Sequence, residues 1–281
     1  MKILLPLNGT SAAHRVLAYA GKLASHQKVE LLLLRAIDPL AFAGENFASL
    51  VTIHLEREML RAAQTYLETI AKRFTDLKPE CLCLVGPARE TIRSVALREG
   101  CDLILMAPYS YGPIARWLVG SMAEQVSHCA PCPVMLLRGE ASIEPRHVLV
   151  PVDGSETSYA VLNYLAPYLT DSTRITVLHC TGVDQSEADA NQATRAYLER
   201  LKADLEAKVA RHPLASLVFS ESHAPEGILS WLEDSDCDLV AMATHGNGGF
   251  DKLFAGGCTD LVARQLERPL LLFPPASGKT R

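Results

Sequence analysis

The stretch Lys2–Thr10 reads KILLPLNGT, and 145 positions later the stretch His147–Ser155 reads HVLVPVDGS. A second pair, GCDLILMA at residues 100–107 and DCDLVAMA at residues 236–243, recurs with an offset of 136. Repetition over such a distance indicates two copies of one structural unit. Because the offset falls by nine, we expect the second copy to lack nine residues, most naturally around positions 39–49 of the first.

The 281-residue chain suits two domains, since single domains usually run to about 100–150 residues. Gly139 and Pro145 interrupt any regular pattern between the copies, as linker residues do. We therefore predict a first domain over residues 1–138 and a second over residues 146–275.

Within each copy, short apolar runs alternate with segments of helical periodicity. The first copy predicts strands at 3–7, 29–36, 80–84, 103–107 and 134–137, with helices at 12–24, 53–74, 88–98 and 121–129. The second predicts strands at 147–152, 175–180, 216–222, 239–243 and 270–273, with helices at 158–169, 191–211, 226–234 and 259–266. This alternation predicts an α/β fold of two tandem, doubly wound, five-stranded parallel-sheet domains. Ligands of such folds bind at the carboxyl ends of the strands.

Composition restricts the possible functions. The net charge of −5, without a run of Lys and Arg, argues against a nucleic-acid partner. No apolar stretch approaches the roughly 20 residues that span a bilayer, so we expect no membrane association. The first six residues lead directly into a turn without a signal-peptide pattern, which predicts a cytoplasmic protein.

The chain has eight cysteines, which we expect to be reduced in the cytoplasm and to pack as small apolar residues. Cys129 and Cys132 have C-x-x-C spacing, but a zinc site needs a second pair, and Cys81 and Cys83 do not supply it. We predict neither a structural zinc ion nor a disulfide.

Polar and small residues follow the strands at which a ligand would bind. Asn8 follows the first strand in one copy, and Asp153 follows it in the other. After the fourth strand, the second copy has Thr244–Gly246 and then, with nine residues between, Gly256. Glycines allow backbone N–H groups to approach phosphate oxygens, and the N-terminus of the next helix adds partial positive charge.

The spacing of Gly246 and Gly256 resembles the nucleotide loop of universal stress proteins, written G-x-x-G-x(9)-G-(S/T). The stretch Val150–Ser158 is similar to that family's first strand and turn, and His128–Val134 to its approach to the last strand. The resemblance covers nearly the whole chain twice, and it implies the adenine-nucleotide α-hydrolase-like fold.

The resemblance also implies a cytoplasmic regulatory protein of the stress response that binds ATP or ADP, with Mg²⁺ on the phosphates as an option. Its site would lie in the second copy, where an acidic residue holds ribose hydroxyls or the metal and backbone groups contact adenine. The implied binding residues are Asp153, Cys180, Met242, Ala243, Gly246, Gly256, Gly257 and Cys258.

Both copies depart from the motif. The second has Ala243 in place of the first glycine and Gly257 in place of Ser/Thr. The first retains Gly120 and Ser121, but it has Asn8, Ala107 and Ser110 where the motif has Asp and two glycines. We therefore expect an asymmetric protein whose better-formed site lies in the second copy.

Other interpretations stay open. The residues after the first strand also suit ordinary turn and N-cap chemistry. The chain could be a scaffold that binds protein partners and no nucleotide. A slow ATPase is the weakest hypothesis, because we identify no catalytic residue and no metal-ligand set. Family members pair through their last strands, which implies that Val134–Leu137 and Leu270–Phe273 are antiparallel neighbours in an internal pseudo-dimer; further homodimerisation is open.

Overall fold

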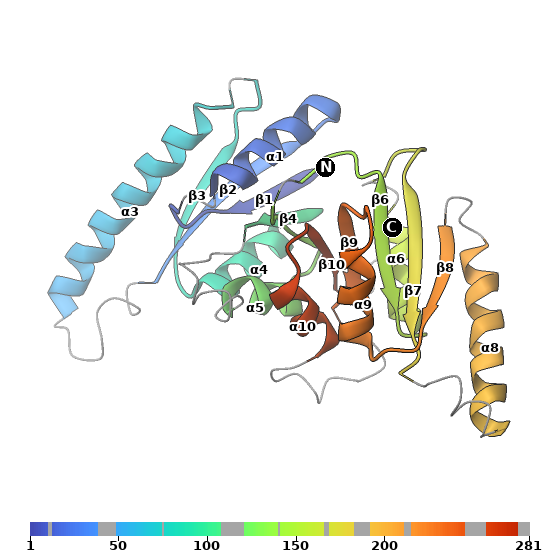
Figure 1. The fold of residues 1–281 in the computed structure, drawn as a ribbon. Helices are drawn as coiled ribbons and strands as arrows, with labels where there is room; N and C mark the ends of the chain where they lie inside the picture. The colour runs from blue at the N-terminus through green and yellow to red at the C-terminus, as the bar shows by residue number, and fades with distance from the viewer. Residues whose placement is uncertain are drawn as a thin grey trace. The chain divides into compact units, whose positions relative to one another are not determined.

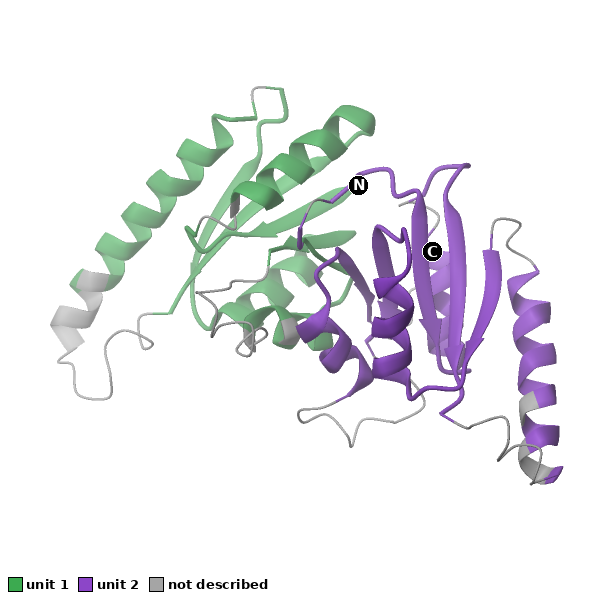
Figure 2. Ribbon diagram, in the orientation of Figure 1, with its two compact units in different colours: residues 1–137 green, residues 138–281 purple. Residues whose placement is uncertain are grey.

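The computed structural model describes ten ranges of the chain: residues 1–10, 13–38, 49–74, 76–107, 121–139, 141–165, 169–182, 192–210, 215–244 and 257–274. The chain divides into two compact units, unit 1 over residues 1–137 and unit 2 over residues 138–281 (Figure 2). Each unit is an α/β structure built on a parallel sheet (Figure 1).

The sheet of unit 1 has the strand order β3-β2-β1-β4-β5. Its strands are β1 (Lys2–Pro6), β2 (Glu30–Ile37), β3 (Glu80–Val85), β4 (Leu103–Met106) and β5 (Val134–Leu136). The helices α1 (Ala13–His26) and α3 (Ser49–Ala71) cover one face, and α4 (Ala88–Arg98) and α5 (Ser121–Cys129) cover the other (Figure 1). The order reverses between β1 and β4, which is where doubly wound sheets bind ligands.

Unit 2 repeats this arrangement with the order β10-β9-β6-β7-β8. Its strands are β6 (His147–Val152), β7 (Arg174–Cys180), β8 (Ala215–Ser220), β9 (Leu239–Ala243) and β10 (Leu270–Phe273). Its helices are α6 (Glu156–Tyr164), α8 (Gln192–Val209), α9 (Ala224–Glu233) and α10 (Cys258–Gln265), with α6 and α9 on opposite faces (Figure 1). The predicted α/β fold with a parallel sheet in each half is confirmed.

The central strands are buried on both faces, as their unbroken apolar sequences predicted. In β2, Leu32, Leu33 and Leu34 have no exposed surface. All six residues of β6 are buried, Pro151 among them. Among the described helices, none is both long and apolar enough to cross a membrane.

The start of α6 differs from its prediction. The sequence pattern places the helix at residues 158–169, whereas the structure begins it at Glu156 and ends it at Tyr164. Ser155 is the N-cap, and its side chain accepts a hydrogen bond from the Ser158 amide. A serine N-cap satisfies one of the amides that a helix leaves unpaired at its start, which fixes the first turn two residues earlier.

The strand registers refine the position of the shorter segment. Lys2 pairs with Glu30 in unit 1, and the corresponding pair in unit 2 is His147 with Arg174, so the offset has already fallen from 145 to 144 at the second strand. The remaining eight residues are lost between the second and third strands. Part of that loss lies in the helix, because α3 has 23 residues and α8 has 18. The prediction of a single nine-residue gap near positions 39–49 is therefore wrong in detail.

An aspartate fastens the amino ends of the strands in each unit. The amide of Lys2 donates to Asp102 Oδ2 at 2.8 Å, and the amide of Asp102 donates back to the Lys2 carbonyl. In unit 2, Asp238 accepts from the amides of Arg146 and His147 at 3.0 and 3.1 Å. These hydrogen bonds join the fourth strand of each unit to its first.

Candidate functional site

The turn after β6 carries the acidic residue of the candidate site. Asp153 Oδ1 accepts from the amide of Ser155 at 3.0 Å and from its hydroxyl at 2.6 Å. Between them Gly154 has a φ of +85°, a conformation that costs an L-residue about 1–2 kcal/mol. The turn is thus rigid, and it presents the exposed Asp153 side chain at the carboxyl end of the strand.

Unit 1 builds the same turn around an amide. Asn8 Oδ1 accepts from the amide and the hydroxyl of Thr10, at 3.2 and 2.8 Å, and Gly9 has a φ of +81°. The local geometry of the two turns therefore matches. What differs is the charge, because Asn8 replaces a carboxylate with a neutral amide.

The end of β7 forms a second wall of the site. Cys180 Sγ donates to the carbonyl of Ala224, the first residue of α9, at 3.9 Å. The close approach depends on Gly227, since a Cβ added there would lie 2.8 Å from Cys180 Sγ. In unit 1 the equivalent positions hold Ala36 on the strand and Thr91 on the helix. The smaller residue is therefore on the strand in unit 1 and on the helix in unit 2.

The third wall is the junction between β9 and α10. Thr259 Oγ1 donates to the carbonyl of Ala243 at 3.2 Å, which holds the start of the helix against the end of the strand. Gly257 is the N-cap of α10 and makes no side-chain capping bond. The first backbone amides of α10 therefore receive no hydrogen-bond acceptor from an N-cap side chain. Such amides at a helix N-terminus suit the binding of an anion. Asp260, in the first turn, acts against this because it already places an acidic group there.

The structure brings three of the predicted residues into one electrostatic neighbourhood. Burial, with smaller contributions from Cys180 and Asp153, raises the pKa of the Cys258 thiol to about 12. Burial also raises the pKa of Cys180. Both thiols are therefore neutral near pH 7 and add no charge to that of Asp153.

The predicted residues Met242 and Ala243 are the last two residues of β9, at the same edge of the sheet. Met242 is buried and Ala243 is half-buried. Gly246 and Gly256 lie outside the described residues, as do Ser110 and Gly120 of unit 1. The described part of the site thus comprises Asp153, Cys180, Met242, Ala243, Gly257 and Cys258.

Unit 1 has a cavity of about 290 Å³ at its own carboxyl edge, which sequence reasoning missed. It lies at the reversal point of the sheet, bordered by the ends of β1, β2 and β4 and by the starts of α4 and α5. Most of its lining is apolar, including Met59, Met106 and Met122. Asn8, Arg35 and Asp38 are its polar members.

Arg35 and His179 occupy equivalent positions, one residue before Ala36 and Cys180. His179 Nδ1 is bonded to the Val152 carbonyl at 2.9 Å, and the ring is buried. Arg35 Nη1 lies 3.5 Å from the carbonyl of Leu7, the residue equivalent to Val152, which is a longer contact than that of His179. The Arg35 residue is half-buried. An arginine after a run of four leucines is the sequence signal that could have identified this position.

A wider, shallower hollow of about 600 Å³ lies between β8 and α9 of unit 2. The buried His147 contributes to it, with its ring nitrogens bonded to Asp236 at 2.6 Å and Thr176 at 2.8 Å. Two hydrogen bonds lower the pKa of Asp236. The one from His147 has the larger effect and the one from Arg174 the smaller. Since His147 and Arg174 begin their strands, this cluster lies at the opposite end of the sheet from Asp153.

Comparison with known proteins identifies the family. The profile of the universal stress protein family matches residues 1–138 and again residues 144–274. The chain belongs to the universal stress protein family. Two matches, one for each half, show that it is a tandem member.

Individual relatives agree with this assignment. A universal stress protein of Thermus aquaticus is 32% identical over 137 residues, covering 48% of this chain and 97% of the relative. One from Mycobacterium tuberculosis is 23% identical over 296 aligned positions, covering 96% of this chain and 95% of its own. The crystal structure of an Archaeoglobus fulgidus universal stress protein has a TM-score of 0.73 at 18% identity, covering 99% and 97% of the two chains. The matches to the Mycobacterium tuberculosis and Archaeoglobus fulgidus proteins therefore extend over nearly the full length of both chains.

Proposed function

We propose that this chain is a regulatory universal stress protein that binds ATP or ADP at the carboxyl edge of unit 2 and does not itself catalyse a reaction. The observation that carries the proposal is the shared neighbourhood of Asp153, Cys180 and Cys258, beside the last residues of β9. These residues lie after β6, at the end of β7 and at the start of α10.

Each part of the edge has a distinct task in the proposal. The Asp153 carboxylate, fixed by Ser155, accepts hydrogen bonds from ribose hydroxyls or holds a magnesium ion carried on the phosphates. The N-terminus of α10 faces the phosphates with amides that Gly257 does not cap. Backbone groups beside Cys180 and Met242 recognise the adenine ring.

Regulation, rather than chemistry, fits this inventory. Among the residues that the structure describes at this edge, we identify no general base for attack on a γ-phosphate. Bound nucleotide would instead bias which surface the protein offers to a protein partner. The competing hypothesis is a scaffold in which both edges are retained for folding, and it predicts no nucleotide binding at all.

A matched exchange of residues tests the proposal. Asp153→Asn gives unit 2 the turn of unit 1, and Asn8→Asp does the reverse. Both substitutions retain the Oδ1 acceptor that shapes the turn. Losing a charged hydrogen-bond partner costs roughly 1–2 kcal/mol, so we expect about a tenfold loss of ATP affinity in Asp153→Asn and no loss in Asn8→Asp.

The measurement is calorimetric titration of the full chain with ATP and with ADP, together with mass spectrometry of any ligand released on denaturation. Absence of binding by the parent chain would establish the scaffold. Equal loss in both variants would show that the site is not the one in unit 2. Steady release of phosphate at a rate abolished by Asp153→Asn would establish an ATPase instead.

A further inference from the structure

The carboxyl edges of the two units differ in charge as well as in shape. Unit 2 presents Asp153 beside half-buried, neutral thiols. Unit 1 presents Asn8 in the equivalent turn and Arg35 in place of the buried His179. A ligand suited to one edge is therefore not the ligand suited to the other.

We propose that the unit 1 cavity binds a small amphipathic anion, an unbranched carboxylate of about eight carbons in all, with Arg35 as the anion-binding group. This inference is independent of nucleotide binding by unit 2. It rests on the position of the guanidinium, on the lining of the cavity and on its size.

The guanidinium lies near the end of β1, which borders the cavity. Arg35 Nη1 is 3.5 Å from the Leu7 carbonyl, and a Cβ added to Gly9 would lie 2.8 Å from the same nitrogen. Leu7 and Asn8 border the cavity, so these contacts place the positive charge beside the end of β1. A Cβ-bearing residue at Gly9 would displace the flexible end of the Arg35 side chain, while the positive φ of Gly9 is what favours glycine there.

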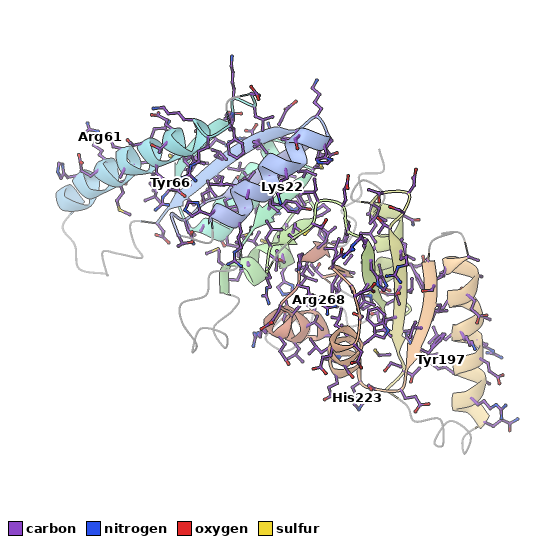
Figure 3. The ribbon with its side chains drawn as sticks, turned by 45° about the horizontal axis from the view of Figure 1, so that its top comes forward. Lys22, Arg61, Tyr66, Tyr197, His223 and Arg268 are labelled. Atoms are coloured by element: carbon purple, nitrogen blue, oxygen red, sulfur yellow. The ribbon has the colours of Figure 1, made fainter. Side chains whose placement is uncertain are left out.

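The charge of Arg35 is held without a described carboxylate partner. Its other contact is with the ring of Tyr66 on α3, whose centroid is 5.3 Å from the guanidinium carbon; Tyr66 is labelled in Figure 3. A cation over an aromatic ring and a long bond to one carbonyl leave most of its five N–H donors for a ligand. Guanidinium groups favour carboxylates because the two planar groups form paired hydrogen bonds.

The lining supplies the apolar half of the recognition. Val16, Leu34, Ile37 and Ile92 form a fixed apolar surface, and the three methionines add side chains that adapt to an irregular or flexible tail. A volume of about 290 Å³ holds roughly ten non-hydrogen atoms at the ~30 Å³ that a water molecule takes in the liquid. Octanoate has ten such atoms, whereas a nucleoside triphosphate is about three times larger.

Asp38 is the residue that opposes this ligand, since its carboxylate also borders the cavity. It lies three residues after Arg35, at the end of β2. Its presence gives the proposal a prediction of opposite sign: removing the charge of Asp38 should strengthen anion binding, whereas removing that of Arg35 should weaken it.

The test is calorimetric titration of the full chain with sodium octanoate, with octan-1-ol and octylammonium as probes of equal tail length. We expect octanoate to bind more tightly than either comparator. Arg35→Met, which retains the apolar length of the side chain, should lose about tenfold in affinity or more. Arg35→Lys should lose less, and Asp38→Asn should gain.

The control is Arg61→Met, which removes an arginine of the same unit whose side chain is 77% exposed and paired with Glu58. It should leave octanoate affinity unchanged. Circular dichroism of each variant separates loss of binding from loss of folding. If Arg35→Met unfolds, the octanoate affinity of Arg35→Lys still tests the proposal.

Three outcomes would overturn the proposal: equal affinity for octanoate and octan-1-ol, unchanged affinity in Arg35→Met, or tighter binding of octylammonium. A fourth is competition by ATP in an Asp153→Asn chain, which would make the cavity a nucleotide site. None of these outcomes depends on whether unit 2 binds nucleotide in the parent protein.

Discussion

Replacing Gly227 by alanine should destabilise unit 2, although alanine is the better helix former. The added Cβ would lie 2.8 Å from Cys180 Sγ and 3.0 Å from Ser220 Oγ. Overpacking of this kind costs about 1–3 kcal/mol, while the change from glycine to alanine within a helix returns about 0.5–1 kcal/mol. The overpacking is the larger effect, so we expect the free energy of unfolding to fall by about 1 kcal/mol.

The same contact predicts a rescue. Cys180→Ala removes the sulfur atom and gives the strand the alanine that unit 1 has at Ala36. In that background Gly227→Ala should cost less, because the shortest contact of the added Cβ is gone and only the longer ones, such as that with Ser220 Oγ, remain. The double-mutant cycle should then show a coupling free energy of about 1 kcal/mol or more.

Urea unfolding of the full chain is a suitable assay, followed by the fluorescence of Trp231 on α9. The chain has two tryptophans, so the experiment uses a Trp117→Phe background in which Trp231 reports on unit 2 alone. If Gly227→Ala is as stable as the parent, or if the two substitutions are additive, the contact between Cys180 and Gly227 does not limit the packing of this site.

Three further experiments test other parts of the structure. Ser155→Ala removes the N-cap of α6 and should cost about 1 kcal/mol of stability, whereas Thr157→Ala within the helix should cost less; urea midpoints compare them. The pKa of Asp236 lies below its ordinary value of 3.8, so ionised Asp236 stabilises the fold above pH 3.8. This stabilisation is lost as the pH falls through the lowered pKa. Acid unfolding of Asp236→Asn should therefore show a smaller dependence on pH in that range. All eight cysteines are free in the structure, so thiol titration of denatured protein should give about eight per chain, and metal analysis should find no stoichiometric zinc.

Much of the fold could be predicted because its signals are local. Alternating apolar and amphipathic segments fix the order of strands and helices, and the repeat makes each half a check on the other. The boundaries of α4, α5, β6, β9 and β10 agree with the sequence to the residue. Helix α6 was misplaced because its start depends on the side-chain bond of Ser155 rather than on apolar periodicity.

The candidate site was less accessible to sequence reasoning because its contacts join distant residues. Nothing local to Cys180 indicates that it packs against Gly227, 47 positions later. Arg35 was passed over because it follows the buried leucines of β2, and only the structure shows its guanidinium reaching the turn at Gly9. The pairing of the last strands of the two units stays a prediction, as does each residue's role toward nucleotide.

The aspartates at the strand starts have a consequence for how such a duplicated protein can diversify. Asp102 and Asp238 align the fourth strand with the first from the end remote from any ligand, so their bonds survive changes at positions 8, 35 or 153. A gene that carries two such units can thus explore new ligands in one half while the other retains its own. The chain is accordingly a natural host for directed evolution, in which a library confined to the edge of unit 1 leaves the edge of unit 2 as an internal reference.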